Sequence, residues 1–268
     1  YFLDAQENKN SKYFNWFYFK KWPNDYLCFL SFKELPKINL DYEPVREHII
    51  KAAKYWLSLG FDGFRLDHVI GPKHGFWKEF SREIKKDFPN AVLIGEAWMQ
   101  DIRFNKLKTI NVRNKYLKWL LGASSDSLLK EYIVELDGVL DFRFNDLIKK
   151  FVKNNLSQQK LLKKLKQHFS KYPRNYFLPT FLDNNDMNRF LFECGNDKEK
   201  LKEAAKLQFS INQPLIIYYG TEIGMTQQKS IKDFAKHGDL QARQPMRWQQ
   251  QNKELFEFYK SLIEKKNN

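Results

Sequence analysis

The sequence has few cysteines and no long hydrophobic run. Its 268 residues include only Cys28 and Cys194, far apart in the chain, so a disulfide framework is not expected and both read as small apolar residues. No run of 18 apolar residues occurs, so no membrane span is expected. No secretory leader follows Tyr1, which is not expected to be the natural start, and the compartment therefore stays open.

The chain carries a formal charge of +14, mostly from lysine. A strongly basic balance is typical of nucleic-acid-binding proteins. Here the lysines are spread along amphipathic helical segments, and no nucleic-acid-binding motif accompanies them. Solvated helix faces are therefore the favoured interpretation, and neither a nucleic acid nor a membrane is expected as a partner. A biased genome or adaptation to heat would enrich lysine in the same way.

Two acidic residues follow two short apolar segments with strand character. Asp67 ends the segment 61–67, Glu96 ends the segment 91–96, and the helical segment 74–87 lies between them. An acid at the exit of each strand is typical of neighbouring strands of a parallel α/β barrel, where reacting groups gather at the carboxyl ends. Two carboxyl groups facing one cleft are what glycoside hydrolysis requires.

The same alternation continues through the rest of the chain. Further strands are predicted over residues 139–144, 177–183 and 214–219. Helices are predicted from residues 41–44 to a stop at Gly60, in a lysine-rich region after the strand 91–96, and over residues 146–169, 198–210 and 254–265. This gives five strand–helix units where a closed barrel has eight, so the expected fold is α/β, of the (β/α)8 TIM-barrel type but incomplete.

Four stretches with the expected order and spacing resemble motifs of the α-amylase family of glycoside hydrolases (family 13). They are Gly63–Asp67 for the nucleophile, Ile94–Trp98 for the acid/base, Phe181–Asp186 with Arg189 for the third carboxylate, and Leu35–Asn39 for the neopullulanase and cyclomaltodextrinase branch. The similarity continues between these motifs, as in Tyr218–Gly224 and Arg243–Trp248, and covers nearly the whole chain.

The resemblance also implies a domain organisation. Residues 1–40 correspond to the end of the inserted lobe (domain B), and residues 41–268 correspond to strands four to eight of the catalytic barrel. The first three strands and the C-terminal β-sandwich are expected to be absent from this chain. The missing barrel half would then come in cis or from another chain, an oligomer is possible, and the fragment alone is expected to be inactive.

Asp67 and Glu96 are the candidate nucleophile and general acid/base. Arg65 lies two residues before Asp67, so both side chains face the same side of the strand and the guanidinium is expected to contact the carboxylate and keep it ionised. Glu96 follows an apolar run, a setting that favours the neutral acid needed to protonate the glycosidic oxygen. The structural alternatives are a buried Arg–Asp ion pair and a strand-end acid that caps the next helix.

Asp186 is the third candidate catalytic acid, and by resemblance it would grip sugar hydroxyls and support the transition state. Its structural alternative is a polar turn, because the segment Asp183–Asp186 is rich in turn residues. Arg189 is expected beside Asp186 in a charge network. Arg65, Trp98, Asn185 and Arg189 are the candidate substrate-binding residues. Family members usually have histidine where this chain has Asn185, so weaker transition-state support is expected.

No metal or other cofactor is expected. His68 and His74 lack a third ligand at suitable spacing, and His74 is interpreted as a helix-start residue. Many relatives use calcium, so calcium is possible in a full-length protein, but the upstream asparagine that would bind it has no match here. Ile70 and Gly71 stand where many α-amylases have lysine and histidine, which agrees better with the neopullulanase-like branch.

The predicted function is a retaining α-glycosidase that acts on α-linked glucans such as starch, maltooligosaccharides, cyclodextrin or pullulan. The first alternative is a transglycosylase of the same family, in which a sugar hydroxyl replaces water. The second is a non-catalytic binding module derived from the barrel. The aromatic stretch Tyr13–Trp22 is interpreted mainly as packing within the lobe rather than as a platform for sugar rings.

Overall fold

The structure is a computed structural model that describes residues 1–29, 32–98, 125–233, 238–249 and 252–267. The chain forms two compact units, Tyr1–Asp137 and Gly138–Asn268. None of the helices within the described residues is long and apolar enough to span a membrane.

The first unit begins with an aromatic lobe. Its elements are helix α1 (Phe2–Glu7), a 3-10 turn (Phe14–Trp16) and two antiparallel strand pairs, β1 (Phe19–Lys21) with β2 (Asp25–Tyr26) and β3 (Cys28–Phe29) with β4 (Phe32–Pro36). Trp16 and Phe17 are buried and form a small core with Ala5 and Val45. The rings of Phe14 and Phe19 stack on one another. Most of the aromatic stretch therefore packs within the lobe, as the sequence predicts.

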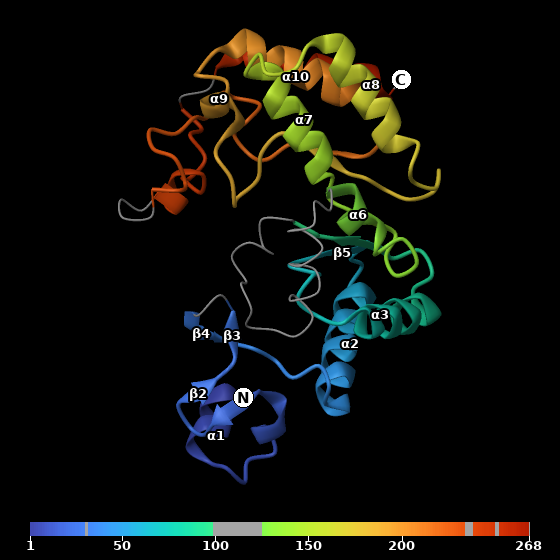
Figure 1. Ribbon diagram of the computed structural model, residues 1–268, viewed down its shortest axis with the longest axis vertical. Coiled ribbons are helices and arrows are strands. Elements are labelled where there is room, and N and C mark those ends of the chain that lie inside the picture. The colour runs from blue at the N-terminus through green and yellow to red at the C-terminus, as the bar shows by residue number, and fades with distance from the viewer. Residues whose placement is uncertain (30–31, 99–124, 234–237, 250–251, 268) are drawn as a thin grey trace. The chain divides into compact units, whose positions relative to one another are not determined.

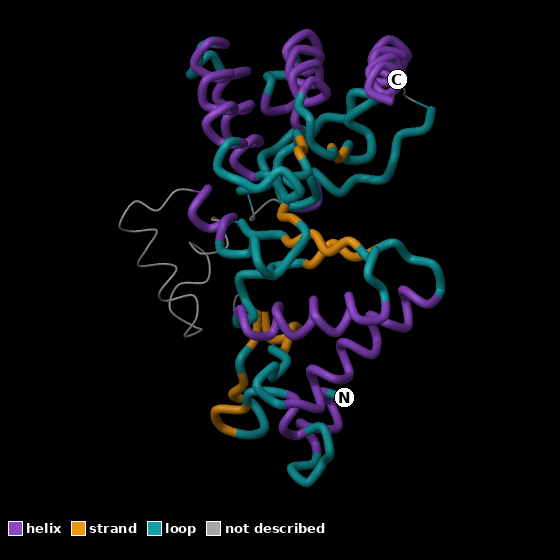
Figure 2. The backbone as a smooth tube through the Cα atoms, turned by 90° about the vertical axis from the view of Figure 1, so that its right-hand side faces the viewer, coloured by secondary structure: helices purple, strands orange, loops and turns teal. Residues whose placement is uncertain are grey.

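An α/β segment follows the lobe. It comprises helix α2 (Glu43–Ser58), strand β5 (Gly63–Leu66), helix α3 (His74–Asp87) and strand β6 (Val92–Gly95). Pro44 occupies the first turn of α2, and Gly60 adopts φ +97° just beyond its end, which is a left-handed conformation that glycine adopts without penalty. β5 and β6 pair in parallel with Gly63 opposite Val92. Both strands of this pair are short (Figure 2).

Helix α3 contributes an apolar face to the interior of the first unit. Its residues Phe76, Trp77, Phe80 and Ile84 are buried, and they lie on one face of the helix. In strand β6, the side chain of Leu93 is fully buried.

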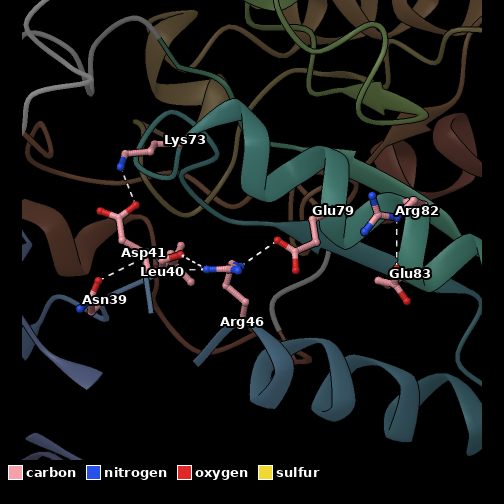
Figure 3. A network of polar contacts seen from close by, with 8 residues as sticks. All are labelled: Asn39, Leu40, Asp41, Arg46, Lys73, Glu79, Arg82 and Glu83. Atoms are coloured by element: carbon pink, nitrogen blue, oxygen red, sulfur yellow. Dashed lines mark hydrogen bonds and ion pairs between the residues drawn. The ribbon is translucent and has the colours of Figure 1, made fainter. Parts of the chain in front are cut away.

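A polar network joins the lobe to α2 and α3 (Figure 3). Asp41, at the exit of the lobe, accepts from Lys73 at 2.5 Å and from the hydroxyl of Tyr18 at 3.1 Å. Arg46 of α2 pairs with Glu79 of α3 at 2.8 Å and donates to the carbonyl of Leu40 at 3.2 Å. The network therefore holds the exit of the lobe against the beginnings of both helices.

The ion pair between Asp41 and Lys73 predicts a small, pH-dependent contribution to stability. The hydrogen bond from Lys73 holds the pKa of Asp41 below its usual 3.8. Asp41 therefore contributes stability that is present above that value and is lost as the pH falls through the lower folded-state pKa. Both side chains are about half exposed, so the effect should stay below about 1 kcal/mol.

Urea unfolding of the unmodified protein and of the Lys73→Met variant measures this contribution. The variant should be slightly less stable at about pH 7, and the difference should be smaller at about pH 2, because Asp41 loses its charge as the pH falls through its lowered folded-state pKa. A difference that is equal at both pH values would show that Lys73 stabilises the fold by packing and not through Asp41.

The second unit is mostly helical. Its elements are β7 (Gly138–Val139), α7 (Phe142–Val152), α8 (Gln158–Phe169), β8 (Thr180–Phe181), α9 (Phe190–Glu193), α10 (Lys198–Ser210), β9 (Leu215–Ile216), the 3-10 turn Gly238–Gln241 and α11 (Lys253–Asn267). β8 and β9 are parallel, and Gly138 forms a parallel bridge with Phe177. Its core lies between the short strands and helices α7, α8, α10 and α11.

Two of the predicted elements in this unit are wrong in detail. Residues 139–144 are not one strand, because the side chain of Asp141 accepts from the amide of Phe144 at 2.8 Å and caps the start of α7. The single helix predicted over residues 146–169 is two helices, α7 and α8. Asn154 takes up φ +59° after α7, a conformation that a continuing helix does not allow.

The described residues form small parallel sheets and do not form a closed barrel. The α/β class predicted from the sequence is confirmed at this level. The lysine-rich helical region predicted after Glu96 falls mainly on residues 99–124, which lie outside the described residues. The part that is described includes helix α6 (Ser125–Lys130).

Candidate active site

The two candidate acids lie side by side at the carboxyl ends of β5 and β6. Asp67 directly follows β5, and Glu96 directly follows β6. The backbone ladder continues past the strands, since Glu96 donates its amide to the carbonyl of Leu66 at 2.8 Å and Val69 donates to the carbonyl of Glu96 at 3.1 Å. The sequence predicts this placement of the two acids at neighbouring parallel strand ends, and the structure agrees.

Arg65 connects the two acids. Its Nη1 lies 2.5 Å from Oδ1 of Asp67, and its Nη2 lies 2.5 Å from Oε2 of Glu96. The contact with Asp67 is the one that the two-residue spacing along the strand predicts, whereas the contact with Glu96 was not predicted. One planar guanidinium therefore holds both carboxylates at the same edge of the sheet.

The two carboxyl groups lie in different surroundings. The side chain of Asp67 is 69% exposed, while that of Glu96 is only 5% exposed. Asp67 is therefore accessible to a ligand, and Glu96 is enclosed by protein. Trp98, predicted to bind substrate, follows two residues after Glu96 and is partly buried.

The loop after Asp67 is held by hydrogen bonds to its backbone. The carbonyl of Val69 accepts from Nε1 of Trp77 at 2.8 Å and from the hydroxyl of Tyr132 at 3.2 Å. Val69 itself is fully buried. These bonds fix the backbone next to Asp67, so the position of the carboxylate is set by the core of the unit.

A cavity of about 730 Å³ opens beside Arg65 and Asp67. Strand β5 with the loop that follows it, the hairpin β3–β4 with the residues up to Leu40, and helices α2 and α3 form its walls. Most of the lining side chains are apolar. A volume in this range is typical of small-molecule binding sites, which place a few polar groups in mainly apolar walls.

Asp186 belongs to the second unit, five residues beyond the end of β8. Its amide donates to Oδ1 of Asn184 at 2.9 Å, which forms a tight polar turn. Its carboxylate forms an ion pair with Arg243, and Nε of Arg243 donates to the carbonyl of Asn185 at 3.1 Å. Arg243 was assigned no role from the sequence, although it lies in one of the segments that resemble the family, which is the signal that could have pointed to it.

Arg189 has other surroundings than those predicted for it. Its side chain is fully buried, and its guanidinium lies 4.3 Å from the ring centre of Tyr218 and 4.6 Å from that of Tyr219. It also donates to the carbonyl of Tyr219 at 2.5 Å. The ion pair of Asp186 is with Arg243, so the setting of Arg189 favours holding the chain after β9 rather than touching a ligand.

A metal site is not formed by the residues that the structure describes. Among them, no three or more histidine, cysteine, aspartate or glutamate side chains come together in a way that could hold a metal ion. His74, at the start of α3, instead contacts Glu135 at 2.7 Å and Glu131 at 3.5 Å.

Several known proteins are similar to this chain along nearly its whole length. The chain is 33% identical to Alpha-amylase 2 of Dictyoglomus thermophilum, over 98% of this chain and 42% of that protein. It is 30% identical to Neopullulanase 2 of Thermoactinomyces vulgaris, over 96% of this chain and 40% of that protein. Among solved structures, a cyclomaltodextrinase superposes with a TM-score of 0.77 at 29% identity, over 98% of this chain and 42% of that one.

These relatives confirm the resemblance drawn from the sequence, including its neopullulanase and cyclomaltodextrinase branch. The chain spans 42% and 40% of the length of the two curated relatives. The family model for the catalytic domain of alpha-amylase matches residues 4–268. The chain therefore belongs to the alpha-amylase family of glycoside hydrolases.

Proposed function

We propose that this chain carries the nucleophile and the acid/base of a retaining α-glycosidase that acts on α-linked glucans. The observation that carries the proposal is the bridge that Arg65 makes from Asp67, which lines the cavity with it, to the buried Glu96. Retaining glycosidases need two carboxyl groups that flank one glycosidic bond. The names of the relatives, a neopullulanase and a cyclomaltodextrinase, support the choice of α-glucans.

Asp67 is the proposed nucleophile. It is the exposed member of the pair, and its ion pair with Arg65 holds the carboxylate that would attack the anomeric carbon. The attack forms a covalent glycosyl-enzyme intermediate and expels the rest of the glucan as an alcohol. Arg65 holds the carboxylate in the direction of the cavity, which contributes positioning.

Glu96 is the proposed acid/base. It protonates the leaving glycosidic oxygen in the first step and takes a proton from water in the second. Such a group must hold a proton and then release it. Burial favours the neutral form of a carboxyl group and a nearby guanidinium favours the ionised form, and Glu96 experiences both.

Asp186 is the proposed third acid, with Asn185 beside it. Hydroxyl contacts that strengthen in the transition state would lower the barrier, and Asp186, at 34% side-chain exposure, is accessible for them. Arg243, which pairs with Asp186 and bonds the backbone of Asn185, is the proposed positioning residue for this turn. Asn185 can hydrogen-bond a sugar hydroxyl but carries no charge, unlike a protonated histidine.

A fluorinated glucosyl donor that traps the intermediate tests the proposal, in the intact enzyme that combines this chain with the missing barrel half. After digestion, mass spectrometry should find the label on Asp67, and the Asp67→Asn variant should stay unlabelled. Label on Asp186 or Glu96 would contradict the assignment. Product analysis with maltotriose then separates two outcomes, because hydrolysis gives shorter sugars only, whereas transglycosylation also gives longer ones.

A further inference from the structure

The turn that carries Asp186 is bonded to a loop from elsewhere in the second unit. This loop, residues 227–231, lies between β9 and the 3-10 turn Gly238–Gln241 along the chain. It is hydrogen-bonded to Asn188 and Arg189, which follow shortly after Asp186. The loop therefore contacts the chain immediately after the candidate acid.

Asn188 uses every polar atom of its side chain in these contacts. Its Oδ1 accepts from Nε2 of Gln227 at 2.9 Å and from the amide of Ile231 at 2.8 Å. Its Nδ2 donates to Oε1 of Glu193 at 2.8 Å. Glu193 ends helix α9, which is labelled in Figure 1. One carboxamide thus joins the turn to the loop on one side and to a helix on the other.

Gln227 is the reciprocal partner of Asn188, and it is buried, at 4% exposure. Its Oε1 accepts from the amide of Arg189 at 2.6 Å. Its Nε2 donates to Oδ1 of Asn188 and also, at 2.6 Å, to the carbonyl of Lys229. Each of the two carboxamides therefore accepts from a backbone amide of the other segment, and a direct bond between them closes the interlock.

The backbone of Asp186 is thereby held from both sides. Before it, Oδ1 of Asn184 accepts from the amide of Asp186 at 2.9 Å. After it, the buried Met187 leads directly into the interlocked pair. The carboxylate of Asp186 is nevertheless 34% exposed. An acid that meets a ligand from a fixed direction needs such a backbone, because a small displacement of the contacting group costs much of its effect.

The alternative is that the interlock only attaches the loop to the unit. A second tie of the same stretch of chain separates the two roles. Oγ1 of Thr226, the residue before Gln227, donates to Oδ1 of Asn196 at 2.5 Å. Of these two ties, the one at Gln227 reaches the backbone next to Asp186. Loss of the other tie therefore measures what attachment of the loop alone contributes.

We infer that Asn188 and Gln227 are positioning residues that set the direction in which the carboxylate of Asp186 meets the substrate. The inference deepens the proposed function and rests on it for the role of Asp186. Neither residue is assigned a contact with substrate or a proton transfer, because both act through the backbone of the turn. Since the contacts of Asp186 are proposed to strengthen in the transition state, a misplaced turn should lower kcat more than it raises KM.

Steady-state kinetics with maltotriose test the inference in the intact enzyme that combines this chain with the missing barrel half. Gln227→Met keeps the length of the side chain and removes its donor and acceptor. Asn188→Ala removes the other half of the interlock at a partly exposed position. Each should lower kcat at least about tenfold and change KM less than about threefold. The double variant should lose less than the product of the two single effects, because both break one tie.

Asp186→Asn is the background that shows whether Gln227 acts through Asp186. If it does, adding Gln227→Met to Asp186→Asn should lower kcat by less than about twofold. An aryl maltoside with a good leaving group keeps the turnover of this slow background measurable. A full further tenfold loss would show that Gln227 supports the enzyme independently of Asp186, and the inference would be wrong.

Thr226→Val is the matched control, because it removes the other tie of the same stretch and nearly keeps the side-chain volume. Its kcat should stay within about twofold of the parent. Equal losses in Thr226→Val and Gln227→Met would assign the effect to attachment of the loop and overturn the inference. So would an unchanged kcat in both Gln227→Met and Asn188→Ala. Rates are compared at a temperature at which melting curves show every variant to be folded.

The inference and the proposed function fail in distinguishable ways. If the parent enzyme neither turns over maltotriose nor takes up the fluorinated label, the proposed function is wrong before any variant is compared. If Asp67 is labelled and Gln227→Met keeps its kcat, the proposed function stands and the positioning role is wrong. Hydrogen exchange at the amide of Arg189 follows the interlock without turnover, and it should be faster in Gln227→Met but not in Thr226→Val. Unchanged exchange in Gln227→Met would also contradict the inference.

Discussion

With the missing barrel half supplied in cis or by another chain, replacing Asp67 with asparagine is expected to lower kcat on maltotriose by at least about 10⁴-fold, because an amide cannot form the glycosyl-enzyme ester. The side chain keeps its size and an oxygen that can accept from Arg65, and it is exposed, so stability should change by less than about 1 kcal/mol. Initial rates with maltotriose, together with urea unfolding, measure the two effects separately.

Asp87→Asn is the matched control for this variant. Asp87 also carries an exposed carboxylate that pairs with a basic residue, Lys54, at 2.7 Å, but it lies at the end of α3 and does not line the cavity. Its kcat should stay within about twofold of the unmodified protein. Equal losses in the two variants, or substantial turnover by Asp67→Asn, would remove Asp67 from the role of nucleophile.

Replacing Asp183 with alanine is expected to destabilise the second unit strongly. Asp183 is 1% exposed, and its carboxylate accepts from the amide of Phe190 and from the hydroxyl of Thr221, each at 2.8 Å. Burial raises the pKa of this carboxyl. Alanine would leave both donors buried without an acceptor, which should cost about 3 kcal/mol or more.

Asp197→Ala provides the comparison. Asp197 also accepts from two donors, the amides of Glu199 and Lys200, but it does so at the exposed start of α10. Water can replace the lost acceptor there, so the cost should be about 1 kcal/mol. Urea unfolding of both variants gives the two values. Similar losses would mean that the buried network around Asp183 contributes no more than an ordinary helix cap.

The elements around the two acids could be predicted because their sequence patterns are local. Apolar spacing and the stop at Gly60 predict α2, and the alternation of strand and helix places Asp67 and Glu96 at adjacent strand ends. The contact between Arg65 and Asp67 follows from strand geometry alone. These features depend on residues that are close in sequence, so one chain without relatives is enough to find them.

Other features depend on contacts that no local pattern encodes. Asp186 and Arg243 are 57 residues apart, and Phe29 and His68 come from different segments, so their contacts exist only in the folded chain. The break between α7 and α8 was missed because apolar residues recur with helical spacing on both sides of it, and the short segment that separates the helices is marked only by the left-handed Asn154. The start of α7 was missed because a capping aspartate, Asp141, also fits a strand end.

Backbone hydrogen bonds continue between the chain segments that follow β5 and β6. They make the positions of Asp67 and Glu96 independent of the hairpin β3–β4. The backbone of Glu96 is hydrogen-bonded to Leu66 and to Val69. The relative position of the two acids is therefore set by the backbone of the sheet. The hairpin β3–β4 contacts the loop after β5 through Phe29 and His68, and most residues of β4 are exposed. Under the proposed function, mutations in the hairpin would change the cavity wall while Asp67 and Glu96 keep their spacing, so preference among glucans would change without loss of the proposed chemistry.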